Sequence, residues 1–537
     1  MDEIPVLIIG GGPVGLTASI LLSRQGVSSL LVERHPGTAV HPKARGINAR
    51  TMEMYRQCAI ETAIRAAGLA PEQTGLIVWA RSLAGEEIER RVPWRSGPQS
   101  TAVSPVRNCL CAQDVFEPVL RRFAEREPVG ELRFGSEVVE LRQDNDAVTA
   151  VLADRAGGAQ TRVRARYVIA ADGAQSQTRR QLSVHMLGRE NVYESVNILL
   201  HADLRPWTAH RPAALYFIEH PNIKATFLTI NAADRWGFLV NSLSAYGYAA
   251  SDFTPARSAE LVRLAAGVPD LAVEVLGIAP WTASAHVAEQ YRHGRIFLAG
   301  DAAHEMPPTG GFGLNTGVQD AHNLVWKLAA VLHGVAAPSL LDTYHDERQP
   351  IGRAITEQSL ENSISMGRLA GHNSGTLARP EYLNEQGMIF GATYASAAVI
   401  SDGTAPAQLA NPVSDYVPSA RPGGRAPHVW LERDGGRVST IDLVGHGFVL
   451  MAGANGAAWC EAAQHLAREM KLRLDALTIG ADGIADPDRQ WAAAYGVEDS
   501  GAVLVRPDGY VGWRSAAANK NTSATLRNAL MQVLGRD

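Results

Sequence analysis

Cysteine is scarce in this sequence, with four residues among 537. So few cysteines in so long a chain exclude a disulfide framework. Cys109 and Cys111 have no second Cys or His pair at zinc spacing, so we predict no metal site and interpret them as small buried hydrophobes. Cys460 is solitary, and the C-terminal region lacks a Cys-x-x-Cys segment, which argues against dithiol redox chemistry there.

Long apolar runs and basic blocks are also absent. No uninterrupted apolar run approaches the roughly 18 residues of a membrane-spanning helix. The N-terminus, MDEIPVLIIGGG, has acidic residues where a signal peptide carries basic ones. The formal net charge is −5, without basic clusters, which argues against nucleic acid as the main partner. We therefore expect a cytoplasmic protein that binds neither a membrane nor nucleic acid.

The length and composition indicate an ordinary globular protein of two or three domains. A chain of 537 residues is too long for one hydrophobic core. Its residues are 46% apolar and 20% charged, which is typical of folded globular proteins.

The first 33 residues predict a βαβ unit that binds a dinucleotide. A buried strand over 6–9 leads into Gly10-x-Gly12-x-x-Gly15, a helix over 14–25 and a second strand ending at Glu33. The glycines allow a tight turn and close approach of a pyrophosphate, and the acid can hold a ribose hydroxyl. NAD and FAD both fit such a unit. The residues assigned to the dinucleotide are Gly10, Gly12, Pro13, Gly15, Glu33 and Arg34.

A second glycine-rich site follows nearly 300 residues later, within 295–328. An apolar strand over 296–299 ends at Asp301, and a Pro- and Gly-rich loop over 307–313 precedes a helix. Asp301 can accept hydrogen bonds from sugar-like hydroxyls, and glycines let the backbone approach a flat ring. The helix N-terminus offers free N–H groups and partial positive charge. FAD contains a ribityl chain that such a site can hold and NAD does not, so this site favours FAD.

The sequence resembles the group A FAD-dependent aromatic hydroxylases in several separate motifs. These are GxGxxG, DGAQSQTR from Asp172, and the run GDAAH, PPTGGFG and DAHNLVWKL. The resemblance implies that Asp301 binds the ribityl hydroxyls and that the helix starting near Leu314 faces the flavin N1–C2=O edge. Lys43 stands where many relatives have Arg, which puts a nicotinamide-phosphate role there in doubt. The flavin residues implied by the resemblance are Arg45, Gln113, Val138, Asp172, Asp301, Pro308, Gly311, Gly313, Leu314 and Asn315.

Short strands over 196–204, 213–219, 224–231 and 236–242 predict an inserted antiparallel sheet that covers the flavin and an aromatic substrate. Adjacent residues on a strand point to opposite faces, so only one of Tyr216 and Phe217 can contact the substrate. The candidate lining residues are Tyr216, Phe217, Phe227, Trp236, Phe238 and Asn241.

The predicted fold class is therefore α/β. It combines a Rossmann-like FAD-binding domain of the para-hydroxybenzoate hydroxylase type with the inserted sheet and a thioredoxin-like C-terminal domain. The FAD-binding domain is expected over 1–183 and 292–410, and the substrate sheet over 184–291. A Pro- and Ser-rich linker over 411–424 precedes the C-terminal domain, 425–537, for which we expect a structural or oligomeric role.

The closest family pattern is that of the aromatic polyketide hydroxylases of antibiotic biosynthesis. It implies that NADPH or NADH reduces FAD, that O₂ gives a C4a-hydroperoxyflavin, and that one oxygen atom passes to a polycyclic phenol. The same scaffold allows Baeyer–Villiger insertion, epoxidation or antibiotic-inactivating oxidation, and a non-catalytic flavin protein is a more distant alternative. A halogenase is disfavoured because no Trp-x-Trp-x-Ile-Pro segment occurs. No catalytic acid or base can be named, and His304 is interpreted as structural.

Overall fold

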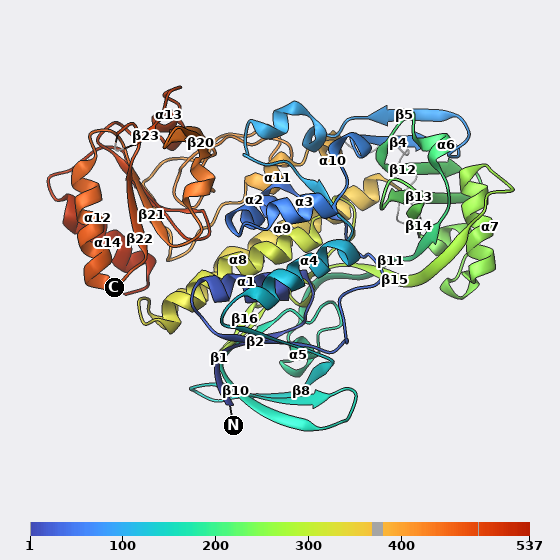
Figure 1. The fold of residues 1–537 in the computed structure, drawn as a ribbon, viewed down its shortest axis with the longest axis horizontal. Coiled ribbons are helices and arrows are strands. Elements are labelled where there is room, and N and C mark those ends of the chain that lie inside the picture. The colour runs from blue at the N-terminus through green and yellow to red at the C-terminus, as the bar shows by residue number, and fades with distance from the viewer. Residues whose placement is uncertain (1, 368–379, 482, 537) are drawn as a thin grey trace.

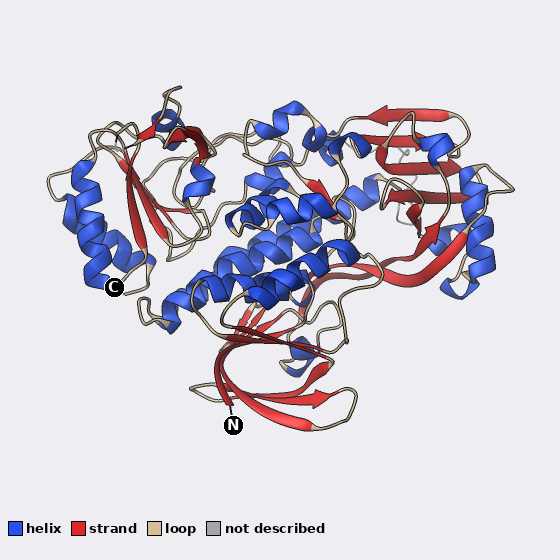
Figure 2. Ribbon diagram, viewed as in Figure 1, coloured by secondary structure: helices blue, strands red, loops and turns tan. Residues whose placement is uncertain are grey.

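The computed structural model describes residues 2–367, 380–481 and 483–536, which form three neighbouring parts (Figure 1). A central part contains the N-terminus, one parallel sheet and the longest helices. A second sheet lies on one side of it and the C-terminal domain on the other (Figure 2). The mixed α/β architecture agrees with the predicted fold class.

The central sheet has the strand order β16-β17-β10-β1-β2-β7. β1 lies between β10 and β2 and is parallel to both, and its apolar residues are buried on both faces. A hairpin of β8 and β9 extends the sheet from β10. The bounds are β1 (Asp2–Ile9), β2 (Ser29–Glu33), β7 (Gly130–Phe134), β8 (Ser136–Gln143), β9 (Val148–Asp154), β10 (Gln160–Ala170), β16 (Arg292–His293) and β17 (Ile296–Leu298).

Helices cover this sheet and carry the main core. α1 packs between α8 and α4, and α9 lies beside α8 (Figure 1). Almost every side chain of α8 after its first turn is buried, so this helix crosses the middle of the molecule. The bounds are α1 (Pro13–Arg24), α2 (Ala49–Gln57), α3 (Glu61–Ala67), α4 (Gln113–Arg126), α5 (Gln177–Gln181), α8 (Gly313–Leu332) and α9 (Thr343–Ser365).

The second sheet has the order β18-β15-β11-β14-β13-β12-β4-β5. The strands predicted between 196 and 242 all occur, but β4 and β5 come from 76–91, outside the predicted range 184–291. α7 (Pro255–Ala266) covers one face of the sheet, and α6 (Arg205–Thr208) lies near its edge. The strands are β4 (Leu76–Ala80), β5 (Glu87–Arg91), β11 (Met186–His201), β12 (Ala213–His220), β13 (Ile223–Thr229), β14 (Arg235–Asn241), β15 (Glu274–Ala288) and β18 (His304–Glu305).

Two long strands join this sheet to the central part. β11 and β15 pair antiparallel over most of their length and run from the central sheet to the second one (Figure 1). β18, which follows Asp301, pairs with β15 at His286 and Val287. The segment predicted to hold the flavin is therefore hydrogen-bonded directly to a strand of the second sheet.

The C-terminal domain contains a four-stranded sheet of order β22-β21-β24-β25, with α12 and α14 packed together beside it. A smaller sheet, β20-β19-β23, adjoins it. Residues 411–424, the predicted linker, form no helix or strand. The bounds are β19 (Trp430–Arg433), β20 (Gly436–Ser439), β21 (Phe448–Ala452), α12 (Ala457–Met470), β22 (Leu474–Thr478), β23 (Ile484–Ala485), α13 (Trp491–Tyr495), β24 (Ala502–Val505), β25 (Val511–Ser515) and α14 (Thr522–Val533).

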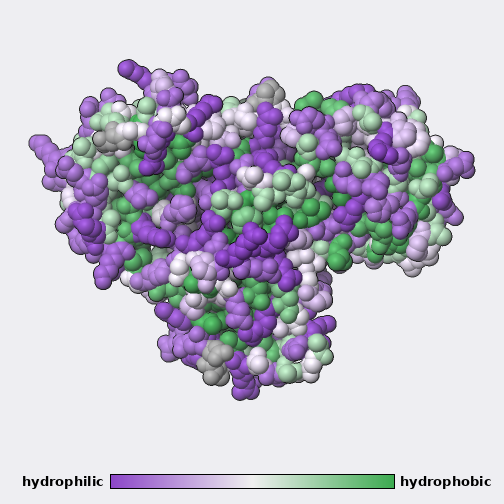
Figure 3. Space-filling model, viewed as in Figure 1, coloured by the Kyte–Doolittle hydropathy of each residue, from purple (hydrophilic) through white to green (hydrophobic). Residues whose placement is uncertain are grey.

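The remaining short elements lie between these parts. β3 (Gly46–Ile47) pairs with β6 (Cys109–Leu110), and α10 (Pro380–Leu383) and α11 (Gln386–Phe390) follow α9. Among the described residues, no helix is long and apolar enough to cross a membrane. Hydrophilic and hydrophobic side chains are mixed over the visible face (Figure 3).

Candidate flavin and substrate site

The turn between β1 and α1 has the geometry of a phosphate-binding turn. Gly10 has a φ of +107°, and a Cβ there would lie 2.3 Å from the carbonyl oxygen of Ala171. A Cβ at Gly15 would lie 1.9 Å from the carbonyl oxygen of Gly10. Gly12, by contrast, has space around it, and the nearest atom to an added Cβ would be Glu117 Oε1 at 3.7 Å. Gly10 and Gly15 permit the turn and its packing, while Gly12 leaves backbone that a pyrophosphate can approach.

Glu33, at the end of β2, is held by two backbone groups. The N–H of Gly11 donates to Oε2 at 2.6 Å and that of His35 to Oε1 at 2.8 Å. Each oxygen keeps a further lone pair for a ribose hydroxyl. Pro13 is the first residue of α1, whereas the predicted Arg34 is exposed and contacts the His35 ring.

Gln113 and Glu117, one turn apart on α4, hold the loop that follows β2. Gln113 accepts a hydrogen bond from the Ala44 N–H through its side chain (3.2 Å) and donates its own N–H to the Ala44 carbonyl (2.8 Å). Glu117 accepts from the Ala39 N–H at 2.9 Å, and burial raises the pKa of its carboxyl. The two side chains therefore hold this loop, through hydrogen bonds, beside the turn at Gly12.

Arg45 joins this loop to the second sheet. Its Nη1 donates to the carbonyl oxygen of Thr229 in β13 at 3.2 Å. Burial lowers the pKa of Arg45 to about 10, which still leaves it charged at neutral pH. Within the described part of the chain, no carboxylate forms an ion pair with it. Arg45 therefore supplies a positive charge at the junction of the nucleotide-binding loop and the sheet, while Lys43 is exposed.

The turn after β10 is built around Asp172. The hydroxyl of Ser176 donates to Asp172 Oδ1 at 2.6 Å and itself caps α5 by accepting the N–H of Arg179 at 2.9 Å. The Arg179 guanidinium donates to the carbonyl oxygens of Ala174 (2.7 Å) and Ala302 (3.1 Å). This arginine thus fixes the Asp172 turn against the segment around Asp301.

Asp301 lies in a short 3₁₀ turn after β17. Solvent reaches its carboxylate, yet the surrounding protein raises its pKa by desolvation. Behind it, Asp320 of α8 accepts from the Gly300 N–H (3.1 Å) and pairs with His304 (2.7 Å) and Arg348 (2.8 Å). His304, Asp320 and Arg348 are each fully buried. His304 therefore lies behind the turn, buried against Asp320.

The loop before α8 leaves space on one side and is tied down on the other. Gly311 has a φ of +70° and no atom within 4 Å of an added Cβ. Asn315 accepts from the Asn48 N–H (2.9 Å) and donates to the carbonyls of Gly46 (3.0 Å) and Gly311 (2.8 Å). The first turn of α8 has no acidic residue, so its free N–H groups present an uncompensated positive end.

The other predicted flavin residues are placed as follows. Pro308 is exposed in the loop before α8, Gly313 starts α8 and Leu314 is half-buried next to it. Val138 is buried in β8, where it pairs with Leu152, so its backbone contact with an adenine stays a prediction.

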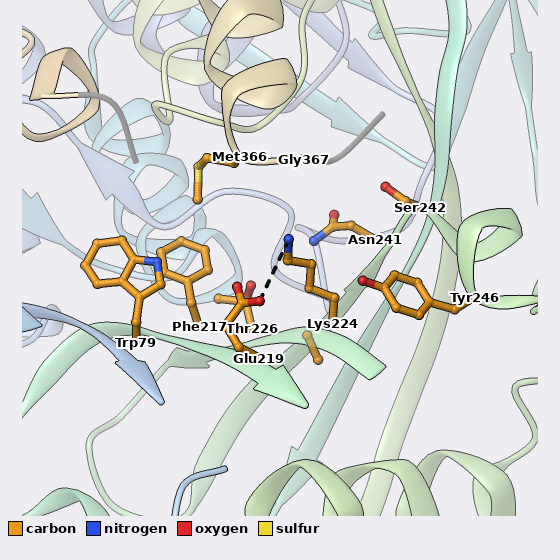
Figure 4. Close-up of a pocket in the computed structure, with 11 residues that line it drawn as sticks. Trp79, Phe217, Glu219, Lys224, Thr226, Asn241, Ser242, Tyr246, Met366 and Gly367 are labelled. Carbon is orange, nitrogen blue, oxygen red and sulfur yellow. Dashed lines mark ion pairs between the residues drawn. The ribbon is translucent and has the colours of Figure 1, made fainter. Parts of the chain in front are cut away.

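A hollow lies on the face of the second sheet opposite α7 (Figure 4). Trp79 and Phe217 form one wall, with ring centroids 5.3 Å apart and planes 25° apart. Met366 at the end of α9 faces them. The polar side chains that line the rest are Glu219, Lys224, Thr226, Asn241, Ser242 and Tyr246.

Of the six residues predicted to line the substrate site, only Phe217 and Asn241 reach the hollow. The other four point to the opposite face and pack under α7, because residues one apart on a strand alternate between faces. Tyr216 shows the difference: its hydroxyl donates to the Arg211 carbonyl at 3.0 Å inside that core. The residues corrected to core positions are Tyr216, Phe227, Trp236 and Phe238.

The cleft fits FAD. Open backbone at Gly12 and Gly311, an exposed Asp301 and a helix N-terminus match the pyrophosphate, ribityl chain and ring of that cofactor. An FAD binding domain family matches residues 3–359, and an aromatic-ring hydroxylase C-terminal family matches 419–537. This chain belongs to the group A FAD-dependent aromatic hydroxylases.

Individual relatives of this hydroxylase span its full length. Tetracenomycin B2 monooxygenase-dioxygenase of Streptomyces olivaceus is 40% identical and covers 99% of both chains. 4-Methyl-5-nitrocatechol 5-monooxygenase of a Burkholderia species is also 40% identical and covers 99% of this chain and 98% of its own. The crystal structure of aklavinone-11 hydroxylase in a ternary complex with FAD and aklavinone superposes with a TM-score of 0.89, at 36% identity, and covers 100% of both chains.

The C-terminal domain of the hydroxylase is anchored by buried ion pairs. Glu347 of α9 accepts from Arg506 at 2.6 Å and from Lys327 of α8 at 2.7 Å. Asp508 accepts from Arg506 and from the Trp326 indole N–H (3.1 Å). These side chains are all buried, so the domain is joined to the helix whose N-terminus faces the flavin cleft.

A second buried cluster joins α2 to the same domain. Arg425 pairs with Glu53, and Arg50 donates to Glu53 (3.0 Å) and to the Asp508 carbonyl (2.8 Å). Sequence reasoning did not identify the partners of Arg50. The acid three residues after Arg50 was the available signal, because it lies on the same face of a helix.

Sequence reasoning also missed Glu117 at the nucleotide turn and Trp79 and Lys224 at the hollow. Glu117 follows Gln113 by one helical turn, so its position beside the cofactor could have been inferred from spacing. Trp79 could not, because its strand joins the second sheet from a distant part of the chain.

Proposed function

We propose that this FAD-dependent monooxygenase hydroxylates an extended polycyclic phenol of the aromatic polyketide type. The observation that carries the proposal is the hollow on the second sheet, the sheet that Arg45 of the flavin loop contacts at β13. Trp79 and Phe217 offer flat apolar contact to fused rings. The names of the tetracenomycin and aklavinone relatives support the same substrate class.

The protein's own residues orient the reactants. FAD, reduced by NADPH or NADH, supplies the activation of O₂ and the transfer of one oxygen atom. Asp301 holds the ribityl hydroxyls, and the positive end of α8 favours negative charge on the ring edge. Arg45 favours the ionised form of a phenol at the junction with β13, which makes the ring a better nucleophile. The Gly311 side of the loop leaves room for the flat ring.

The proposed partners are a small aromatic substrate and molecular oxygen, and the proposed compartment is the cytoplasm. All four cysteines are buried and none forms a disulfide bond, which fits a reducing environment. The buried contacts of the C-terminal domain support a structural role within one chain.

The test is NADPH and NADH oxidation by the purified holoenzyme, with dissolved oxygen followed, in the presence and absence of polycyclic phenols. Oxidation stimulated by such a compound, with an added hydroxyl in the product, is the expected result. A ring-expanded ester or an epoxide would instead assign Baeyer–Villiger or epoxidation chemistry. Bound FAD that neither nicotinamide reduces, whatever the aromatic, would contradict the proposal.

A further inference from the structure

The hollow lies at the hairpin end of β13, where Lys224 and Thr226 line it. Arg45 contacts the carbonyl of Thr229, at the end of the strand nearest the flavin cleft. Lys224 lies near the other end, one residue from the β12–β13 hairpin, and its side chain lines the hollow. Lys224 and Thr229 are five steps apart along the extended strand, which corresponds to about 17 Å at about 3.3 Å per residue. A single ring held beside Arg45 is too short to reach Lys224, whereas fused rings extend toward it.

At the far end, Lys224 is only loosely paired. Its Nζ lies 3.8 Å from Glu219 Oε2, beyond the usual length of an N–H···O hydrogen bond (Figure 4). Among the residues that the structure describes, Glu219 is the polar partner identified for this ammonium. The side chains are 26% and 13% exposed, so both are partly withdrawn from water. Lys224 therefore retains hydrogen atoms that can be donated to a ligand in the hollow.

Glu219 limits what that ligand can be. Burial raises the pKa of its carboxyl, while Lys224 and Arg81 partly oppose the shift. An ionised Glu219 repels a second carboxylate brought to Lys224 and accepts a hydrogen bond from a neutral hydroxyl. The pair thus presents one donor and one acceptor side by side, and its net charge is close to zero.

We propose that Lys224 and Glu219 determine substrate specificity by recognising an uncharged edge that carries a carbonyl and an adjacent hydroxyl. Lys224 donates to the carbonyl oxygen, and Glu219 accepts from the hydroxyl. This edge lies at the end of the substrate opposite the ring beside the flavin. The inference rests on the proposed function, since it deepens the substrate class of that same site, and it excludes substrates with a carboxylate at this end.

The experiment compares binding of danthron, a dihydroxyanthraquinone, with binding of rhein, its carboxylated analogue. Dissociation constants are measured on the FAD-loaded enzyme from the change in flavin absorbance. We expect the wild type to prefer danthron. Lys224→Met should weaken danthron binding about tenfold or more, the loss of a charge-assisted hydrogen bond. Glu219→Gln should shift the preference toward rhein by about tenfold, because the repelling charge is gone.

Arg257→Met is the matched control. Arg257 pairs with Glu260 at 2.9 Å on α7, on the other face of the same sheet, and should leave both dissociation constants unchanged. Absence of danthron binding by the wild type, or unchanged preference in both hollow variants, would overturn the proposal. Because binding is read without turnover, failure of this inference is separable from failure of the monooxygenase function, which nicotinamide oxidation reports.

Discussion

Arg179 donates a hydrogen bond to the carbonyl oxygen of Ala302, 123 residues further along the chain. The bond joins the Asp172 turn to the Asp301 turn, so one guanidinium sets the relative position of two segments that are both predicted to contact FAD. Such a contact positions the cofactor's ligands without itself being one of them.

Arg179→Ala should therefore weaken FAD binding by about tenfold or more, because both turns lose a shared anchor. The dissociation constant is obtained by titrating apoenzyme with FAD and following flavin fluorescence. Arg180→Ala is the control, since Arg180 is exposed and contacts only the neighbouring Gln175 among the described residues. Equal FAD affinity of the two variants would show that Arg179 has no positioning role.

Asp320→Asn should lower the free energy of unfolding by about 3–5 kcal/mol, because it leaves Arg348 buried without its carboxylate. Burial alone would raise the pKa of Asp320, but Arg348 and His304 together lower it. The pair's contribution is thus present above the unfolded pKa of about 4 and is lost as pH falls through the lower folded value. Urea unfolding of both proteins at descending pH should show their stabilities converging in acid; parallel curves would contradict this account.

For Glu385 we expect a pH dependence of the free energy of unfolding that has the opposite sign. Burial raises its pKa to about 7, although Arg95 donates to it at 3.0 Å. Between about pH 4.5 and about pH 7 the folded state therefore binds more protons than the unfolded state, and stability falls as pH rises, by up to about 3 kcal/mol. Glu385→Gln should remove this part of the slope. Chemical unfolding at the two pH limits measures it, and identical slopes for variant and wild type would be the contrary result.

Arg506→Ala should destabilise the protein by about 3–5 kcal/mol, because Glu347 and Asp508 are left buried next to one another with one cation fewer. We also expect weaker FAD retention, since this cluster holds α8. Arg527→Ala, which breaks an exposed pair with Glu469 on the same domain, should change little. Thermal unfolding and flavin content are the measurements. Normal flavin content in a destabilised Arg506 variant would contradict the expected effect on FAD retention and leave the C-terminal domain a purely structural role.

Two adjacent residues of β12 should separate folding from substrate binding. Tyr216→Phe removes the hydroxyl that bonds to Arg211 and should cost about 1–3 kcal/mol of stability while KM stays unchanged. Phe217→Leu alters the wall of the hollow and should raise KM several-fold with a smaller loss of stability. Steady-state kinetics with a stimulating phenol and urea unfolding test both, and the reverse pattern would place the substrate on the α7 face.

The local motifs could be predicted because short-range sterics and hydrogen bonding specify them. Gly10 needs its positive φ, and Asp301 closely follows a buried strand; each constraint lies within a few residues. His304 is fully buried and pairs with Asp320, which is consistent with the structural interpretation. What could not be predicted depends on distant partners: Arg50 meets Asp508, 458 residues away, and nothing local reveals it.

The substrate face illustrates the same limit. Strand alternation establishes that Tyr216 and Phe217 point to opposite sides, but it does not reveal which side α7 covers. Only the packing of α7 on Tyr216 and its neighbours decides this. Trp79 reaches the hollow through pairing of β4 with β12, a parallel contact between segments far apart in the chain.

The central claim is that the enzyme inserts one atom of dioxygen into a polycyclic phenol. Its most direct test is turnover under isotope-labelled O₂ with a phenol that stimulates NADPH oxidation, followed by mass spectrometry of the product. The account predicts one labelled oxygen atom in a new ring hydroxyl. Product oxygen derived from water, or nicotinamide oxidation that yields only peroxide with every phenol, would contradict it.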